Sequence, residues 1–371
     1  MPGRDLCRRL LALQRLLARL KKKWLEWTRR SGQVYFLDRV PEYREMWRAA
    51  AEELGGKFVP LADDLWEIEV ALARTRVHLH QTEFDNPAVL GLAARKPAVH
   101  RLLADAGLPV PEFAVFSLDD LEPAYRFQAA HPAGCVVKPA NGYGGQGVTT
   151  HLLKRSEVRK AAILASLYDR ELLIEAQIPG ECYRLLVLEG SLIHAVCRRG
   201  ARLKGDGVSR IRSLVEAEAE RRRASGQPGV DLDKDCAFTL AYQGLSADSV
   251  PAEGKTFLVK SVNDPARKYA EVRTVYNEVV TDLVCDSLRR DAESAAHVVR
   301  SDFLGVDVIT TDPSVPLHRS GGVINEVNTT PALHHHYDSP GARYPHAALD
   351  VLRAILRRKA AAMEPRRACK A

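Results

Sequence analysis

The chain has 371 residues, of which 46% are hydrophobic and 27% charged, so it is long enough for two or three subdomains with ordinary cores. No apolar run is long enough to span a bilayer, and we expect no signal peptide, which excludes an integral membrane protein. The seven cysteines are scattered, odd in number and never spaced as Cys-x-x-Cys. This pattern argues against disulfide frameworks and zinc ribbons and favours a reducing, cytoplasmic location.

The net charge of +7 is distributed unevenly along the chain. Residues 1–30 contain ten basic and two acidic residues, and residues 353–371 contain seven basic residues and one acidic residue, whereas the segment between them is net acidic. A broadly basic surface is typical of nucleic-acid-binding proteins. Because only the ends are basic, we expect no nucleic-acid partner.

The first 30 residues contain leucines and tryptophans at alternating intervals of four and three, which predicts a basic amphipathic helix. Three uses of its apolar stripe remain open: docking on a partner helix, lying on an anionic membrane, or packing on the protein's own body. We favour helix docking, either within the chain or in a homodimer or higher oligomer; a cleaved organelle-targeting peptide is a minor alternative. The stripe comprises Leu6, Leu10, Leu13, Leu17, Leu20, Trp24 and Trp27.

The rest of the chain alternates between strand and helix patterns, which predicts an α/β (α+β) fold. A helix at 41–54 between strands at 34–37 and 57–61 suggests a βαβ-type domain over 31–95, with a third strand at 77–79. The stretch 198–212 is interpreted as a charged, glycine-bearing connection. Further strands are expected at 113–116, 172–175, 183–189, 191–198, 256–260, 305–310 and 322–327, and helices at 98–106, 118–130, 156–168, 211–223, 231–242, 275–300 and 344–363.

A glycine-rich loop within residues 135–150, CVVKPANGYGGQGVTT, separates two β-type runs. Glycine lets the backbone approach a ligand closely, and successive N–H groups in such a loop can bind an anion. The loop returns into a strand, so it is neither a Walker loop nor a dinucleotide fingerprint. We interpret it as a flap over nucleotide phosphates, with Lys138 at its mouth. The alternative is an ordinary glycine-rich hairpin with a solvated lysine.

Acidic residues also interrupt two late apolar strands. Asp307 lies within VDVI, and Glu326 lies within VINEVN, two residues before Asn328, so the last two side chains share one face of a strand. A carboxylate in a buried strand is costly unless it is paired or bound to a metal. Oxygen ligands of this kind suit Mg²⁺. The alternative is that basic side chains balance these acids.

Together these stretches resemble the ATP-grasp superfamily, and within it cyanophycin synthetases and the ligase half of bifunctional glutathione synthetases. Six segments occur in family order between Lys96 and His336, and no Mur-ligase-like domain follows them. They are KPAVHRLLADAGLPVP, VVKPANGYGGQGVTT, LLIEAQIPGECYRLLVLEGSLIHAVCRR, KGDGVSRIRSLV, LGVDVIT and INEVNTTPALHHH.

The resemblance implies ATP and two Mg²⁺ ions as cofactors, with Mn²⁺ as a substitute, and it implies a role for each matching residue. Two departures stand out: Cys182 occupies the position of the usual ribose-binding acid, and DPARKYAEVRT replaces a Gly-Gly segment after Asn263. The implied ATP-binding residues are Lys96, Lys138, Gly144, Gly145, Gly147, Glu175, Ala176, Gln177, Ile178 and Glu181. The implied catalytic residues are Arg184, Arg198, Lys260 and Asn263, and the implied metal ligands are Asp307, Glu326 and Asn328.

These features predict a basic helix at 1–30, a small α/β domain at 31–95, central and C-terminal ATP-grasp subdomains at 96–170 and 171–363, and a basic tail at 364–371. The resemblance implies an ATP-dependent ligase that joins the carboxylate of one amino acid or peptide to the amine of another through an acyl phosphate. Two alternatives remain: a kinase of the same fold, and a weakly catalytic nucleotide-binding subunit. The three adjacent histidines, His334 to His336, are not expected to bind zinc, and one of them is expected to contact substrate.

Overall fold

The computed structural model describes residues 2–28, 40–84, 87–142, 146–224, 243–260, 277–337 and 346–368, together with 232, 236, 240, 263–264 and 270–271. The predicted strand at 34–37 and most of the predicted helix at 231–242 lie outside these residues. No helix in the described part is long and apolar enough to cross a membrane.

The part of the chain after the first helix is a helix packed on an antiparallel three-stranded sheet. The predicted βαβ unit stays a prediction, because its first strand lies outside the described residues, but the sheet contains one strand that was not predicted. The strand that was missed, Leu65–Val70, alternates buried Trp66 and Ile68 with two glutamates, the pattern of a half-buried hairpin strand. The elements are α2 (Val40–Glu53), β1 (Lys57–Pro60), β2 (Leu65–Val70) and β3 (Ala73–His78).

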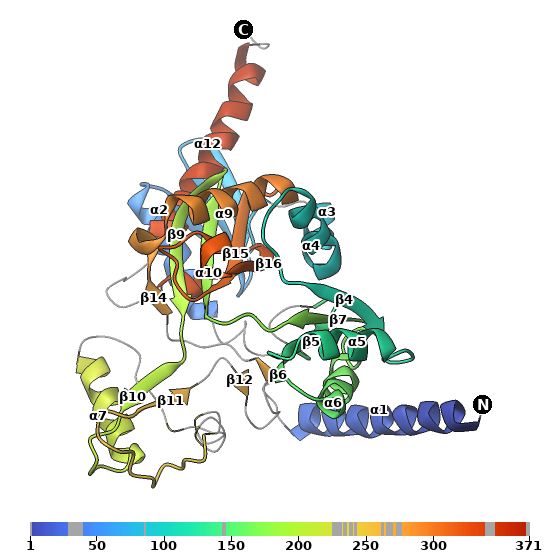
Figure 1. The fold of residues 1–371 in the computed structure, drawn as a ribbon. Helices are drawn as coiled ribbons and strands as arrows, with labels where there is room; N and C mark the ends of the chain where they lie inside the picture. The colour runs from blue at the N-terminus through green and yellow to red at the C-terminus, as the bar shows by residue number, and fades with distance from the viewer. Residues whose placement is uncertain are drawn as a thin grey trace.

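A six-stranded sheet forms the lower part of the molecule in Figure 1, with α5 and α6 packed against it. Its strand order is β12-β13-β6-β5-β7-β4, and every neighbouring pair is antiparallel. The glycine-rich loop joins β5 to β6, as predicted. The elements are β4 (Phe113–Ser117), α5 (Glu122–Ala130), β5 (Cys135–Pro139), β6 (Thr149–Leu152), α6 (Arg155–Ala165), β7 (Glu171–Ala176), β12 (Asn263–Asp264) and β13 (Ala270–Glu271).

A five-stranded antiparallel sheet forms the upper part, in the order β14-β9-β8-β15-β16. One face packs on α9, and the other packs on α2, the small sheet and α12. The predicted helix at 275–300 is only partly correct, because its first residues form β14 and a short 3₁₀ helix. The elements are β8 (Glu181–Leu188), β9 (Ser191–Arg198), β14 (Asn277–Val279), η3 (Thr281–Leu283), α9 (Asp286–Val299), β15 (Phe303–Thr310), β16 (Val323–Thr329) and α12 (His346–Ala368).

The remaining elements flank these two sheets. The charged connection at 198–212 contains strand β10, which was not predicted and which pairs with β11. Helix α4 begins at Lys96 and runs from the glycine-rich loop to α9. The elements are α1 (Pro2–Thr28), α3 (Pro87–Ala93), α4 (Lys96–Asp105), β10 (Ala201–Lys204), α7 (Ile211–Ala224), β11 (Thr256–Lys260), α10 (Leu317–Ser320) and α11 (His334–Tyr337).

Candidate functional site

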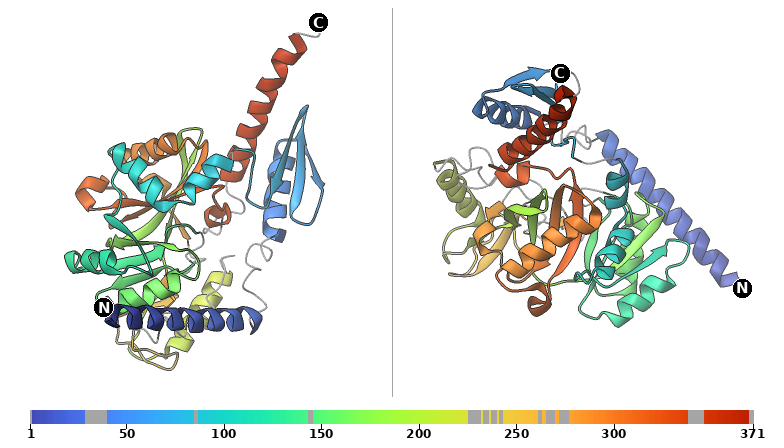
Figure 2. Two further views of the ribbon diagram at one scale, coloured as in Figure 1. Left: turned by 90° about the vertical axis from the view of Figure 1, so that its right-hand side faces the viewer. Right: turned by 90° about the horizontal axis from the view of Figure 1, so that it is seen from above.

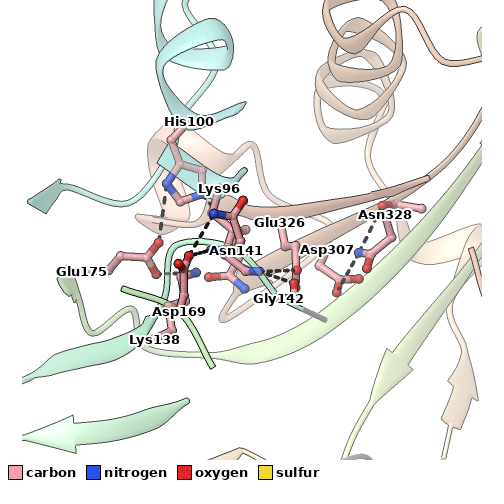
Figure 3. A network of polar contacts seen from close by, with 12 residues as sticks. Lys96, His100, Lys138, Asn141, Gly142, Asp169, Glu175, Asp307, Glu326 and Asn328 are labelled. Carbon is pink, nitrogen blue, oxygen red and sulfur yellow. Dashed lines mark hydrogen bonds and ion pairs between the residues drawn. The ribbon is translucent and has the colours of Figure 1, made fainter. Parts of the chain in front are cut away.

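The site is organised around a row of charged residues that crosses three neighbouring strands. Asp307 of β15 is in register with Arg184 of β8 on one side and with Glu326 of β16 on the other. Side chains of directly opposed residues lie on one face of a sheet, and Asn328, two residues beyond Glu326, joins them. The strands thus bring together one predicted catalytic arginine and three predicted metal ligands, Asp307, Glu326 and Asn328, of which Figure 3 shows the three ligands.

Arg184 and Asp307 form a buried bidentate ion pair, in which Nε donates to Oδ1 and Nη2 donates to Oδ2 at 2.7 Å. Burial by itself lowers the pKa of the Arg184 guanidinium, but the Asp307 carboxylate raises that pKa by more. Burial likewise raises the pKa of the Asp307 carboxyl, but Arg184 and then Arg198 lower it below its usual value. Both groups are therefore charged at neutral pH. Nη1 of Arg198 lies 3.8 Å from Oδ2 of Asp307.

A glycine in β15 makes room for this pair. A Cβ atom at Gly305 would lie 3.0 Å from Cδ of Arg184 and 3.0 Å from Cβ of Pro331. Such contacts are tighter than ordinary packing, so the bare backbone of Gly305 lets the arginine side chain lie close to the strand. The sequence analysis did not assign Gly305 a role, although a lone glycine inside an apolar strand indicates close approach by a neighbouring group.

Lys96 connects the acidic row to the glycine-rich loop. Its Nζ lies 3.3 Å from Oε1 of Glu326 and donates to the carbonyl of Gly142 at 2.7 Å. The backbone N–H of Lys96 also donates to the carbonyl of Ala140 at 3.1 Å, so the start of α4 is fixed to the loop. Pro97 lies in the first helical turn, where a missing N–H costs nothing. One lysine therefore links segments from both sheets (Figure 3).

Lys138, at the mouth of the loop, forms an ion pair with Glu175. Its Nζ lies 2.7 Å from Oε2 of Glu175, and Nδ1 of His100 lies 3.5 Å from the other carboxylate oxygen. All three side chains are buried. The place of Glu175 in the adenine hinge stays a prediction; its side chain contacts Lys138 and His100, and neither contact was predicted (Figure 3).

The other predicted hinge residues follow the end of β7. The N–H groups of Ala176 and Gln177 donate to the carbonyls of Glu112 and Gly134 at 3.0 and 2.9 Å, which holds the segment between β4 and β5. Beyond it, Glu181 at the start of β8 pairs with Arg202 at 2.9 Å. Ile178 lies between these two anchored points.

The glycine-rich loop is described only at its two ends, and Gly144 and Gly145 lie outside the described residues. At its start, Oδ2 of Asp169 accepts hydrogen bonds from the backbone N–H and the side-chain amide of Asn141, at 2.8 and 2.9 Å. Asp169 is a further residue that the sequence analysis missed. The sequence shows only an acidic residue in the turn before β7, and this does not identify Asn141 as its hydrogen-bond partner.

Gly147 at the other end of the loop has φ of +73°, and a Cβ atom there would lie 2.8 Å from Tyr168 and 3.2 Å from Cα of Ala165. We expect Gly147→Ala to lower the free energy of unfolding by about 1–3 kcal/mol for the backbone strain, with a further cost for the contact with Tyr168 and α6. Urea unfolding would measure this. Gly254, with φ of +74° and no atom within 4 Å of such a Cβ, is the matched control. Equal losses for Gly147→Ala and Gly254→Ala would contradict the packing explanation.

Lys260 and Asn263 are described only in their backbone. Lys260 ends β11 and is in register with Ala201 of β10, whereas Asn263 lies in β12, at the edge of the six-stranded sheet. They therefore belong to different sheets although they are three residues apart. Their assignment to the acceptor side of the reaction stays a prediction.

The three consecutive histidines are buried between the five-stranded sheet and the N-terminal part. Nδ1 of His334 is 2.7 Å from the hydroxyl of Tyr43, and Nδ1 of His336 is 2.8 Å from Nδ1 of His194. Among the described residues, no three His, Cys, Asp or Glu side chains are grouped as metal ligands. His194 and Arg198 are four residues apart on β9, so their side chains lie on one face of the sheet. The His194–His336 pair therefore shares this face with the Arg184–Asp307 pair.

Two buried histidines make stability depend on pH. Burial lowers the pKa of the His100 imidazole, and burial together with His194, Arg184 and Arg198 lowers that of His336 well below its usual value of about 6.5. Below pH 6.5 the unfolded chain therefore binds more protons than the folded chain, so stability is full above that pH and falls as pH decreases. We expect the melting temperature to drop between pH 7 and pH 5.

The variant His336→Gln tests this origin of the pH dependence. Glutamine keeps a polar side chain but does not titrate, so the decrease in melting temperature between pH 7 and pH 5 should become smaller. His297→Gln is a suitable control, because His297 is an exposed histidine in the last turn of α9. An equally steep decrease in His336→Gln would show that other groups control the pH dependence.

Comparisons with known proteins show two groups of proteins to which this chain is similar. No protein-family model matches it. The chain is 28% identical over 317 residues to cyanophycin synthetase of Trichormus variabilis, which covers 80% of the chain and 34% of that protein. It is 28% identical over 265 residues to a glutathione biosynthesis bifunctional protein of Listeria innocua, covering 69% of the chain and 33% of that protein. The chain therefore spans about a third of the length of these curated relatives.

A solved structure shows the same fold. The crystal structure of a bifunctional glutathione synthetase from Pasteurella multocida superposes with a TM-score of 0.57 and 21% sequence identity, covering 84% of this chain and 44% of that one. The fold is that of the ATP-grasp ligases. Within that class, the homologues of this chain are cyanophycin synthetases and bifunctional glutathione biosynthesis proteins, so the resemblance inferred from its six segments is confirmed.

Proposed function

We propose that this protein is an ATP-dependent carboxylate–amine ligase that forms an amide bond between amino acids or short peptides. A carboxylate oxygen of one substrate attacks the γ-phosphorus of ATP, and the bond to the bridging oxygen breaks to release ADP. The amine nitrogen of the second substrate then attacks the carbonyl carbon of the acyl phosphate, and inorganic phosphate leaves with one oxygen of the original carboxylate. The observation that carries this proposal is the row Arg184–Asp307–Glu326 joined by Lys96 to the glycine-rich loop.

Each cation has a separate task in this scheme. Lys96, between Glu326 and the loop, contacts the β- and γ-phosphates, and Lys138 supports the phosphates from β5. Arg184 and Arg198 stabilise the negative charge that spreads over the transferred phosphoryl group. Their ion pairs with carboxylates hold these side chains in place before the substrates bind, so the protein reorganises little during the reaction. Gly144, Gly145 and Gly147 cover the phosphates, and the backbone of Ile178 with Ala176 and Gln177 borders the adenine.

The acidic row suits a divalent cation. Asp307 and Glu326 are directly opposed, Asn328 follows on the same face, and Nδ2 of Asn328 lies 3.4 Å from Oδ2 of Asp307. Carboxylate and amide oxygens are the ligands that Mg²⁺ prefers, and the carboxylates paired with Arg184 and Lys96 keep further lone pairs for a metal ion. These residues therefore fit two Mg²⁺ ions, or Mn²⁺ in their place. The bound ions would neutralise the charge of the ATP phosphates.

The scheme leads to a direct biochemical test. Pairs of amino acids are screened for ADP release with ATP and Mg²⁺, and products are identified by mass. We expect ADP to form only when a suitable carboxylate is present, and hydroxylamine in place of the amine to give a hydroxamate. Stable phosphorylated substrate without hydroxamate would support a kinase instead. We further propose that the enzyme works in the cytoplasm, where reduced cysteines such as Cys182 persist.

A further inference from the structure

Among residues 9–23 of the first helix, whose side chains the structure describes, one side contacts the rest of the protein. Leu11 is buried in the core around α6, Nη2 of Arg15 donates to the carbonyl of Ser166 at 2.8 Å, and Arg159 of α6 donates to Gln14 at 2.7 Å. Helix α1 therefore lies along α6 at the edge of the molecule (Figures 1 and 2). This side of α1 therefore packs on the protein's own body, which is one of the three uses considered for this helix.

Four leucines of the predicted stripe, Leu10, Leu13, Leu17 and Leu20, lie on the other side of α1 and are exposed. Five leucines, which we call the leucine face, are each 48–57% exposed. At 100° per residue they occupy an arc of about 120° that is centred roughly opposite Leu11 and Arg15. Single exposed leucines are common on proteins, but a continuous row along a helix indicates an interaction surface. The leucine face comprises Leu10, Leu13, Leu16, Leu17 and Leu20.

The charges that border this face are all basic. Lys23 lies along one edge and Lys21 along the other, Arg9 precedes Leu10 at the N-terminal end of the face, all three are exposed, and no acidic residue occurs between residues 6 and 25. Pairing with a second copy of α1, parallel or antiparallel, would place these cations next to those of the partner. The flanking charges therefore oppose a homodimer through this helix and favour an anionic surface.

We propose that the leucine face of α1 binds the surface of a bilayer that contains anionic lipids. An interfacial helix inserts an apolar face between the headgroups while cations at its edges contact lipid phosphates. The leucine arc is broader than a two-position coiled-coil seam, and in the sequence Trp24 and Trp27 continue its spacing. The contacts of Leu11, Gln14 and Arg15 hold the helix so that its leucine face points away from α6.

Vesicle sedimentation with the full chain tests this proposal. The probes are vesicles of phosphatidylcholine alone and vesicles in which about three lipids in ten are phosphatidylglycerol. We expect the protein to partition at least roughly tenfold more strongly onto the anionic vesicles, and to be released as salt is raised from about 0.1 M to about 0.5 M. Equal partitioning onto both vesicles, or onto neither, would overturn the proposal.

The variants separate lipid binding from other uses of the helix. Leu13→Asp with Leu17→Asp should reduce partitioning at least roughly tenfold without changing the melting temperature, because both side chains are exposed. Leu72→Asp, at an exposed leucine in the β2–β3 turn, is the matched control and should bind like the original protein. A concentration-dependent dimer that the double variant abolishes, without vesicle binding, would assign the face to a second copy. Binding of a synthetic glutamate-rich helix but not of vesicles would assign it to an acidic protein partner.

Discussion

Replacing Glu326 by glutamine is expected to lower turnover by about 10²-fold or more while leaving the fold intact. The change removes one negative charge from the proposed metal site but keeps nearly the same shape, and loss of a metal contact in phosphoryl transfer costs several kcal/mol. ATP affinity should fall less, because Lys96, Lys138 and the hinge remain. The side chain of Glu326 is partly exposed, so little stability is lost.

Two measurements evaluate this prediction: steady-state ADP release and equilibrium binding of ATP to the Glu326→Gln variant. Glu67→Gln is the matched control, because Glu67 also pairs with a basic residue across strands, Arg76 at 3.1 Å, but lies in the small N-terminal sheet. Turnover close to that of the original protein would remove Glu326 from the proposed chemistry. Loss of ATP binding as large as the loss of turnover would mean that Glu326 acts in nucleotide binding alone.

The variant Asp307→Asn is expected to produce the largest loss of stability. It leaves the guanidinium of Arg184 buried without its counter-charge, and breaking a buried ion pair from one side typically costs about 3–5 kcal/mol. The decrease should appear as a lower midpoint in urea unfolding. Replacing both partners, Arg184→Met with Asp307→Leu, removes both charges and should restore most of the stability but no activity. If Asp307→Asn unfolds at the same urea concentration as the original protein, the pair does not stabilise the fold.

The sequence was a good guide to the strands that carry the site. The alternation in VINEVN indicated correctly that Glu326 and Asn328 share a face, and the loop between two strands was predicted from its glycines. By contrast, the opposition of Asp307 to Arg184 depends on the register of strands that are 123 positions apart. Residue spacing contains no information about such a register, so the pairing became visible only in the folded chain.

Buried partners were the least predictable part of the site. Lys138 and Glu175 lie on neighbouring strands, yet His100 comes from a helix, and no local pattern brings it to them. The small N-terminal sheet was predicted incompletely, because β2 pairs with β1 in a hairpin and was missed, although the alternation in LWEIEV is typical of a half-buried strand. Domain boundaries and the roles of Lys260 and Asn263 stay predictions.

Transfer of oxygen from the carboxylate to phosphate tests the proposed ligation most directly. Once the screen has identified a pair of substrates, the carboxylate substrate is labelled with ¹⁸O and the released inorganic phosphate is analysed by mass spectrometry. If an acyl phosphate forms and an amine displaces it, each phosphate released carries one ¹⁸O atom, and the amide product retains the other. Released phosphate without ¹⁸O, formed together with ADP, would show that water rather than the carboxylate attacks ATP, and it would contradict the ligase mechanism.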